Sequence, residues 1–384
     1  MEKVVVGLIT APGLPEELIK DMLEDLSELS SKHIDDKVDW QFDYQTNPLA
    51  ASAEFIDQTF EKAEAIREDN QWDLAIAISD LPSISSNKIV VSEVNYEQTI
   101  SLLSVPSLGA IRVKKKLQNL LMHHITWLHR KDLSETPEGI RLSFINQITE
   151  VSTSEDEVSN KRYIRKSTVA GWSKLVAGMT LMNEPWTALN NLKTIVALSF
   201  ATGTYISIFS IPWELSLDYS LWRFMMLTFI AIFGVVGWLI YAHDLWELVS
   251  SKNQRSYRHL YNFTTMATLL FITIVNYLVV YLLLIISVIV FVPMGLFENW
   301  TRIEPDVEWT DYLNLVWFSA SVGVLAGALG STVEDEGTIQ NVTYSYRQMY
   351  RYKQIEEENE ETTKEEQTEE HAGTKQTHDK SEDD

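Results

Sequence analysis

The sequence predicts a two-part fold: an α/β cytoplasmic domain with a mostly parallel, Rossmann-like sheet, followed by an all-α bundle of four transmembrane helices. Long apolar stretches occupy only the second half of the 384-residue chain, from about residue 194 to 329. Before them, residues 1–130 alternate short β-rich runs with helical ones. That alternation is typical of an α/β sandwich.

Each element of the α/β half follows from its local pattern. Strands are predicted at residues 3–9, 38–44, 73–79, 88–94 and 100–105. Helices are predicted at residues 15–29, 50–69 and 110–129. The helix at 15–29 has proline in its first turn, and the continuous apolar run at 73–79 is typical of a strand buried on both faces.

Four membrane spans fit the apolar stretches, because about twenty apolar residues cross the hydrocarbon core of a bilayer. They are placed at about 194–212, 221–241, 263–292 and 313–330. The third stretch is too long for one upright crossing and too short for two crossings with a turn. We therefore expect it to form one tilted helix.

The distribution of Lys and Arg predicts the orientation of these spans. Basic residues gather before the first span, between the second and third, and after the fourth. In the other two loops, 213–220 and 293–312, the only Lys or Arg is Arg302. The positive-inside rule then places both termini in the cytoplasm, and the start of the chain lacks the features of a secretory signal. The predicted localisation is the cell membrane, as a multipass protein.

The remaining segments complete the predicted organisation. Residues 131–188 are assigned to a linker, with a polar stretch at 151–160 and a basic amphipathic helix at 163–186 that lies on the inner leaflet. The transmembrane domain is assigned to 189–331 and a cytoplasmic juxtamembrane helix to 332–354. The low-complexity stretch 355–384 has 13 acidic and 3 basic residues and is expected to be disordered.

Composition excludes several functional classes. The chain has no cysteine, which rules out disulfides, thiolate catalysis, Cys-based zinc sites and iron–sulfur clusters. Its formal net charge is −23, and residues 1–150 hold 25 acidic against 14 basic groups. Nucleic acid is not expected as a partner, because phosphate contacts need clustered Lys and Arg.

The carboxyl ends of the predicted strands carry the candidate ligand-binding residues, because ligands of parallel α/β sheets bind there. These candidates are Thr10, Asp80, Ser104 and Ser107. Asp80 directly follows a buried strand, and capping of the turn before Pro82 is the simpler role for it. Ser107 is expected to be the N-cap of the following helix. No residue is assigned a catalytic role.

No cofactor and no metal is expected. The turn GLITAPG lacks both the GxGxxG fingerprint and the Lys and Ser/Thr of a P-loop. Glu16 and Glu17 also place negative charge in the helical turn where a phosphate would bind. His123, His124 and His129 invite a comparison with metalloproteases, but their spacing does not match HExxH. We expect solvated histidines on a helix face.

Basic side chains near the predicted membrane are candidates for contact with anionic headgroups. They are Lys114, Lys115, Lys116, Lys161, Arg162, Arg165 and Lys166. A solvated charged face is the alternative interpretation.

The predicted spans carry no Asp, Glu, Lys or Arg at depth, which favours an anchor over a conduit. Asn276 is the one strongly polar side chain at depth. In span four, Ser319, Gly323 and Gly327 recur every four residues and allow another helix to approach closely. This face is predicted to serve helix packing, with a homo-oligomer or a membrane partner as its further use.

Four segments together resemble a family of bacterial multipass membrane proteins of uncharacterised function. They are WDLAIAISDLP (72–82), LLSVPSLGAIRVKKK (102–116), VAGMTLMNEPW (176–186) and GALGSTVEDEGTIQNVTYSYRQ (327–348). Some members carry the label 5,10-methylene-tetrahydrofolate dehydrogenase, which implies a dinucleotide site whose fingerprint is missing here. The strand followed by SVPSLG is also similar to archaemetzincins, without their metal motif, which implies shared architecture only.

These observations lead to one expected function and two alternatives. The chain is interpreted as a membrane-anchored cytoplasmic sensing or interaction module with an unidentified small-molecule ligand or partner. The first alternative is a membrane-bound enzyme that uses the strand ends of the α/β domain. The second is a small transporter with a polar path through spans one and three.

Overall fold

An eight-stranded mixed sheet forms the centre of the α/β domain. Its strands are β1 (Glu2–Thr10), β2 (Val38–Thr46), β3 (Leu74–Ser79), β4 (Ser83–Ser85), β5 (Lys88–Asn95), β6 (Ile100–Ser104), β7 (Gln147–Ser154) and β8 (Glu157–Arg165). They follow the order β2-β1-β3-β6-β5-β8-β7, with β4 paired to β5. The computed structural model describes residues 2–47, 56–85, 88–130, 147–154, 157–165, 169–191, 193–247, 255–301 and 308–329.

Half of this sheet is parallel and half is antiparallel. β2, β1, β3 and β6 pair in parallel, whereas β4, β5, β7 and β8 pair antiparallel. The mostly parallel sheet that the sequence predicts is therefore correct only for the first four strands of the order. The direction reverses because the turn at 96–99 joins β5 to β6 directly, and a connection that short permits only antiparallel pairing.

In the stretch 151–160, predicted to be a polar linker, residues 151–154 belong to β7 and residues 157–160 belong to β8, which pair at the edge of the sheet. β8 pairs with β5 from Arg165 opposite Ile89 to Asn160 opposite Asn95. Backbone hydrogen bonds hold such an edge hairpin, so its sequence needs no strong apolar alternation. The α/β domain thus continues to Arg165, well beyond the predicted boundary at residue 130.

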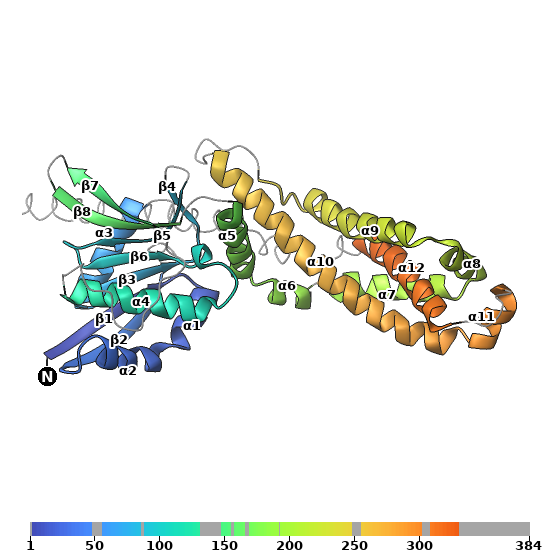
Figure 1. Ribbon diagram of the computed structural model, residues 1–384, viewed down its shortest axis with the longest axis horizontal. Helices are drawn as coiled ribbons and strands as arrows, with labels where there is room; N and C mark the ends of the chain where they lie inside the picture. Colours follow the sequence, from blue (N-terminus) through green and yellow to red (C-terminus); the bar gives the residue numbers. More distant parts are fainter. Residues whose placement is uncertain are drawn as a thin grey trace, which may run out of the picture.

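Helices cover both faces of the sheet (Figure 1). α1 (Leu14–Lys20), α2 (Leu23–His33) and α4 (Val113–Arg130) share one core with β1 and β3, whereas α3 (Ile56–Asp69) packs in the core of the opposite face. The single helix predicted at 15–29 is divided at 21–22, where the chain turns and buries Met22 completely. Gly7 in β1 makes room for Trp72, since a Cβ there would lie 1.7 Å from Trp72 Cε3.

α5 (Val169–Met182) and α6 (Pro185–Asn191) connect the sheet to the second half of the chain. The sequence predicts an amphipathic helix on the leaflet at 163–186. Leu175, Met179 and Met182 are instead buried in the core shared by α4 and β3. α5 also approaches the 3₁₀ helix η1 (Pro106–Leu108) closely, because a Cβ on Gly178 would lie 2.1 Å from Pro106 O. The face of α5 that carries Leu175, Met179 and Met182 is therefore covered by protein.

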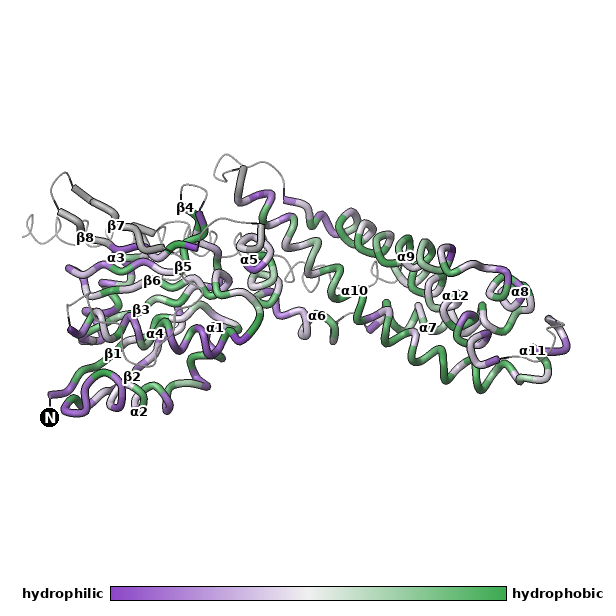
Figure 2. The backbone as a smooth tube through the Cα atoms, in the orientation of Figure 1, coloured by the Kyte–Doolittle hydropathy of each residue, from purple (hydrophilic) through white to green (hydrophobic). Residues whose placement is uncertain are grey.

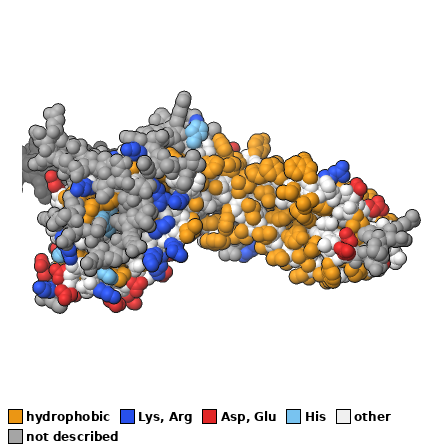
Figure 3. All heavy atoms as spheres, viewed as in Figure 1, with side chains coloured by type: hydrophobic (Ala, Val, Ile, Leu, Met, Phe, Trp, Pro, Cys, Tyr) orange, Lys and Arg blue, Asp and Glu red, His pale blue; other side chains and the backbone are white. Residues whose placement is uncertain are grey.

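The second half of the chain is helical and its surface is largely hydrophobic (Figures 2 and 3). Its helices are α7 (Lys193–Ser207), α8 (Ser210–Asp218), α9 (Leu221–Ala242), α10 (Arg255–Phe291), α11 (Met294–Thr301) and α12 (Trp309–Gly327). Within the described ranges, two helices, α9 and α10, are long and apolar enough to cross a membrane. The pair α7 and α8, bent by 90°, would make a third if it forms one span.

These helices agree with part of the predicted bundle. α10 is one continuous helix of 37 residues, which confirms a single long helix in the third apolar stretch. The first predicted span, 194–212, is bent after Ser207. α12 forms in the fourth stretch but is not among the candidate spans, and Asp311 and Asn314 lie in its first turns. The four-span bundle and the cytoplasmic termini stay predictions, and segments 332–354 and 355–384 lie outside the described residues.

Candidate functional site at the strand ends

The carboxyl ends of β1, β3 and β6 point toward α5 and the beginning of α10 (Figure 1). The structure brings the predicted candidates together there, since Ser79 lies opposite Ser104 in the register and Ala11 N donates to Ile78 O over 2.9 Å. Thr10, Asp80, Ser104 and Ser107 are each at most 2% exposed. We call this group the strand-end site.

The hydroxyl groups of the strand-end site are engaged with the backbone. Ser104 Oγ donates to Leu81 O over 2.8 Å, and Ser107 Oγ donates to Val90 O over 2.9 Å. The two hydroxyl oxygens lie 3.0 Å apart. Ser107 is therefore not the N-cap of the following helix, as predicted, because it lies within η1 and α4 begins only at Val113.

The turn after β3 is stabilised by Ser79, the residue before the predicted capping residue Asp80. Ser79 Oγ accepts a hydrogen bond from Leu81 N over 3.0 Å. Asp80 is 1% exposed between them. Thr10, at the end of β1, lies with its Oγ1 3.4 Å from Thr46 Oγ1 on β2. The strand-end site is thus a buried set of side chains that ties the turns to the sheet.

A carboxylate from another part of the chain occupies the start of α1. Glu184, in the turn between α5 and α6, accepts a hydrogen bond from Leu14 N at its Oε1 over 2.8 Å. A Cβ on Gly13 would lie only 2.6 Å from the same oxygen, so Gly13 makes room for it. In nucleotide-binding α/β folds a phosphate takes this position. Sequence reasoning missed Glu184, because nothing local links it to the start of a helix 170 residues earlier.

The same turn also contacts α10. Asn183 Nδ2 donates to Thr268 Oγ1 over 2.8 Å. Trp186 meets Phe271 edge to face, with ring centroids 5.1 Å apart. Glu184 itself has φ of 47°, a left-handed conformation that costs a non-glycine residue free energy. We call residues 183–186 the NEPW turn; it joins the start of α1 to α10.

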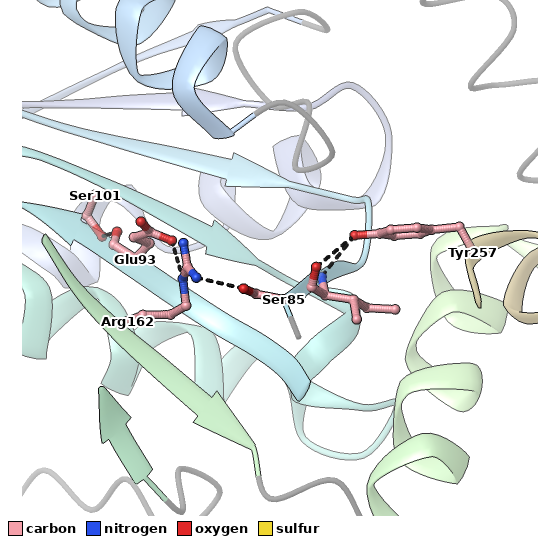
Figure 4. Close-up of polar contacts among 6 residues, drawn as sticks. Ser85, Glu93, Ser101, Arg162 and Tyr257 are labelled. Atoms are coloured by element: carbon pink, nitrogen blue, oxygen red, sulfur yellow. Dashed lines mark hydrogen bonds and ion pairs between the residues drawn. The ribbon is translucent and has the colours of Figure 1, made fainter. Parts of the chain in front are cut away.

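A second contact links α10 to the sheet. The Tyr257 hydroxyl donates to Ile84 O over 3.2 Å and accepts from Ile84 N over 3.0 Å (Figure 4). The hydroxyl group thus bonds to both the N–H and the C=O of Ile84 in β4, as the backbone of a neighbouring strand would. Tyr257 is 8% exposed and belongs to the core of the α/β domain.

The predicted membrane-surface residues do not form one surface. Arg162 pairs with the buried Glu93 over 2.6 Å and donates to Ser85 Oγ over 2.7 Å (Figure 4). Ser101 Oγ completes this cluster by donating to Glu93 O over 3.2 Å. This ion pair lies inside the sheet, so Arg162 is not a headgroup contact as predicted. Arg162 lies on β8, next to the edge strand, and nothing in its local sequence indicated that it would pair with Glu93.

The other predicted membrane-surface residues have varied surroundings. Lys161 Nζ lies 6.0 Å from the ring centre of Trp127, and Arg165 is 5% exposed. Lys114 and Lys115 are exposed, and Lys114 is 3.4 Å from an Asp21 oxygen. Lys116 Nζ donates to Leu108 O over 2.6 Å. Lys166 lies outside the described residues.

His123 and His124 on α4 are buried and His129 is partly buried, which corrects the prediction of a solvated face. His123 Nε2 lies 3.2 Å from the Tyr163 hydroxyl, and His124 Nε2 lies 2.9 Å from Ser92 Oγ. Burial lowers the pKa of His123 to about 4 and, with the charge of His123, that of His124 well below its ordinary value. The β7–β8 hairpin covers His123 and His124, whereas the predicted linker would have left them exposed. No group of three metal-ligating side chains occurs in the part of the chain that the structure describes.

The small-residue face of α12 packs against α7 of the same chain. A Cβ on Gly323 would lie 2.5 Å from Ser199 O, and one on Gly327 would lie 2.9 Å from Ile195 O. Ser319 is fully buried. The predicted close approach of a helix is thus present within the chain, and the contact with a second molecule stays a prediction.

Polar side chains inside the helical half bond to one another across helices. Tyr277 OH lies 2.8 Å from Ser321 Oγ, and Trp317 Nε1 donates to Thr228 Oγ1 over 2.6 Å. These contacts join α9, α10 and α12. Asn276 is 8% exposed. Interhelical bonds of this kind stabilise helix packing.

Comparison of the chain with protein-family models, with curated proteins and with solved structures finds no match.

Proposed function

We propose that this protein is a membrane-attached sensing or interaction module, in which the strand-end face of the α/β domain is coupled to α10. The observation that carries the proposal is the NEPW turn. Through Glu184 it contacts the start of α1, and through Asn183 it contacts α10. A displacement at the strand ends would therefore reach the membrane helices through two hydrogen bonds and no flexible linker.

The second contact of α10 supports the same proposal. Tyr257 holds Ile84, which lies a few residues after the turn at Asp80. Coupling between two sites requires an element that both of them bias. α10 fits that requirement, because it is continuous from the core of the α/β domain to its end at Phe291.

The geometry favours a module over an enzyme at the strand-end site. Ser104 and Ser107 donate their hydroxyl protons to backbone carbonyls, which stabilises the fold. His123 contacts Tyr163 and His124 contacts Ser92, so neither is the base partner of a serine at this site. A serine nucleophile needs such a base within hydrogen-bond reach.

We also propose that the chain spans the membrane four times with both termini in the cytoplasm. The support is the distribution of Lys and Arg, which is depleted in the loops 213–220 and 293–312. A reporter enzyme fused to the C-terminus should be active only in the cytoplasm. Activity on the opposite side would contradict the four-span arrangement.

The coupling can be tested in the full chain with pairs of spin labels. The absence of cysteine allows labels at Lys32→Cys on α2 and Asn299→Cys on α11 without removing native thiols. Low-molecular-weight fractions of a cell extract are screened for those that raise the melting temperature. A stabilising fraction should change the distance between the labels and slow hydrogen exchange in the NEPW turn.

Glu184→Gln provides the control, because it removes the charge that holds the start of α1. This variant should still be stabilised by the same fraction, with little change in the label distance. A fraction that stabilises the protein but leaves both readouts unchanged would contradict coupling. Consumption of a compound from the fraction would instead support the enzyme alternative.

A further inference from the structure

An apolar groove of about 560 Å³ opens where α5 and α6 face α10. Its volume is in the range of ligand pockets. The apolar walls include Ala110, Val176, Ala177, Leu181, Phe263 and Phe271. Trp186 also lines it and is 57% exposed. We call it the junction groove.

Basic side chains lie beside the junction groove. Lys174 follows Ser173, which lines the groove, and a Cβ on the neighbouring Gly109 would lie 3.4 Å from Lys174 O. Lys116 is anchored close by through Leu108 O. Among the described residues, neither lysine forms an ion pair with a carboxylate.

The cations act on one another. Partial burial, followed by the charges of Arg165 and Lys174, lowers the pKa of Lys116. Three positive groups held together in this way create a potential that favours an anion. Figure 3 shows Lys and Arg side chains gathered where the α/β domain meets the hydrophobic half of the molecule.

The junction groove has the polarity of a lipid molecule. Toward the α/β domain it lies beside the cations, and along α10 it is lined by apolar side chains such as Phe263, which is 54% exposed.

We propose that the junction groove binds one acyl chain of an anionic phospholipid, whose phosphate is held by Lys116 and Lys174, with the buried Arg165 adding positive potential. The lipid comes from the leaflet next to the α/β domain. This site goes beyond the proposed function, because it does not depend on any ligand or partner of the strand-end site. Its charge pattern is that of a basic pocket between membrane helices that holds an anionic headgroup.

The test uses the purified full chain in detergent, titrated with dioleoyl phosphatidylglycerol or dioleoyl phosphatidylcholine and followed by native mass spectrometry. One saturable phosphatidylglycerol should bind about tenfold more tightly than phosphatidylcholine, because each basic group near an anionic lipid contributes to affinity. Equal affinities for the two lipids would overturn the assignment of the phosphate to the cations.

The double variant Lys116→Gln/Lys174→Gln should weaken phosphatidylglycerol binding about tenfold and leave phosphatidylcholine binding unchanged. The matched control Lys3→Gln/Lys32→Gln makes the same change of charge at exposed positions and should bind both lipids like the original protein. Equal losses in both double variants would mean a non-specific charge effect and would contradict the proposal.

A third variant tests the acyl chain. Ala177→Phe places a large side chain in the groove and should reduce the affinity for both lipids, while glycerol 3-phosphate should fail to compete at concentrations that saturate the lipid. If Lys116→Gln prevents folding, Lys174→Gln alone and Ala177→Phe still decide the question. Unchanged lipid binding by Ala177→Phe would exclude the groove, and would leave the coupling through Glu184 and Tyr257 standing.

Discussion

The two ends of α10 occupy different surroundings. In its first turns, Tyr257, Leu260 and Tyr261 are at most 8% exposed and belong to the same core as the sheet. Farther along, Leu278 and Leu282 are 54% and 61% exposed. One continuous helix thus contributes to a protein core at one end and presents apolar side chains outward at the other.

This difference shows how the α/β domain is attached. A domain on a flexible linker would keep its own core apart from the membrane helices, whereas here α10 contributes side chains to it directly. The helical half has a second core, to which Leu284 and Val288 of the same helix belong. α10 therefore contributes side chains to both cores.

The largest effect is expected from removing a side chain at the buried end of α10. Tyr261→Ala should destabilise the α/β domain by about 3–5 kcal/mol, because it leaves a cavity in a fully buried position. Leu282→Ala, at an exposed position of the same helix, should cost far less. Hydrogen exchange of β1 and β3 in detergent would measure the effects of both variants. Equal losses of protection would contradict the different burial of the two ends of α10.

The helical core should respond next most strongly to a side chain on α12. Gly323→Leu should cost about 3 kcal/mol, because its Cβ would meet the Ser199 carbonyl at 2.5 Å and the backbone would have to shift. Gly237→Leu on α9 is the control, since nothing lies within 4 Å of a Cβ there. Melting curves that coincide for the two variants would contradict the packing of α7 on α12.

Acid should weaken the α/β domain and spare the helical half. Because burial lowers the pKa of His123 to about 4, the unfolded chain binds the proton first as the pH falls below about 6.5. The stabilisation is complete above that pH and declines toward pH 4, by about 2 kcal/mol at pH 5. Hydrogen exchange of β5 and of α9, measured above pH 6.5 and at pH 5, would show the loss of stability in the α/β domain alone. His123→Gln should reduce the pH dependence of the exchange of β5.

The smallest effect is expected where the NEPW turn contacts the start of α1. Glu184→Gln keeps an acceptor for Leu14 N but removes its charge, so the start of α1 should lose about 1 kcal/mol. The protection of α1 against exchange should fall, while that of α9 should not change. A global loss of stability would show that Glu184 supports more than this connection.

Much of the architecture could be predicted because it depends on local patterns. Runs of apolar residues define β1 and β3, and the length of an apolar stretch defines α10 as one helix. The spacing of Ser319, Gly323 and Gly327 indicated close helix packing before any partner was known. Each of these signals lies within a single helix or strand, where the regular backbone geometry fixes which residues share a face.

The prediction failed where a segment acquires its role from distant partners. The segment of β7 and β8 was predicted to be a linker, because these strands form only by pairing with each other and, through β8, with the distant β5. His123 and His124 looked solvated until that hairpin covered them.

By itself, the sequence determined that an α/β domain precedes apolar helices, because hydrophobic periodicity and span length are local quantities. Only the tertiary structure decided that Glu184 occupies the start of α1 and that Tyr257 belongs to the sheet domain. Those contacts join residues 170 and 173 positions apart. No local pattern encodes such a pairing, which arises only when both segments are folded against each other.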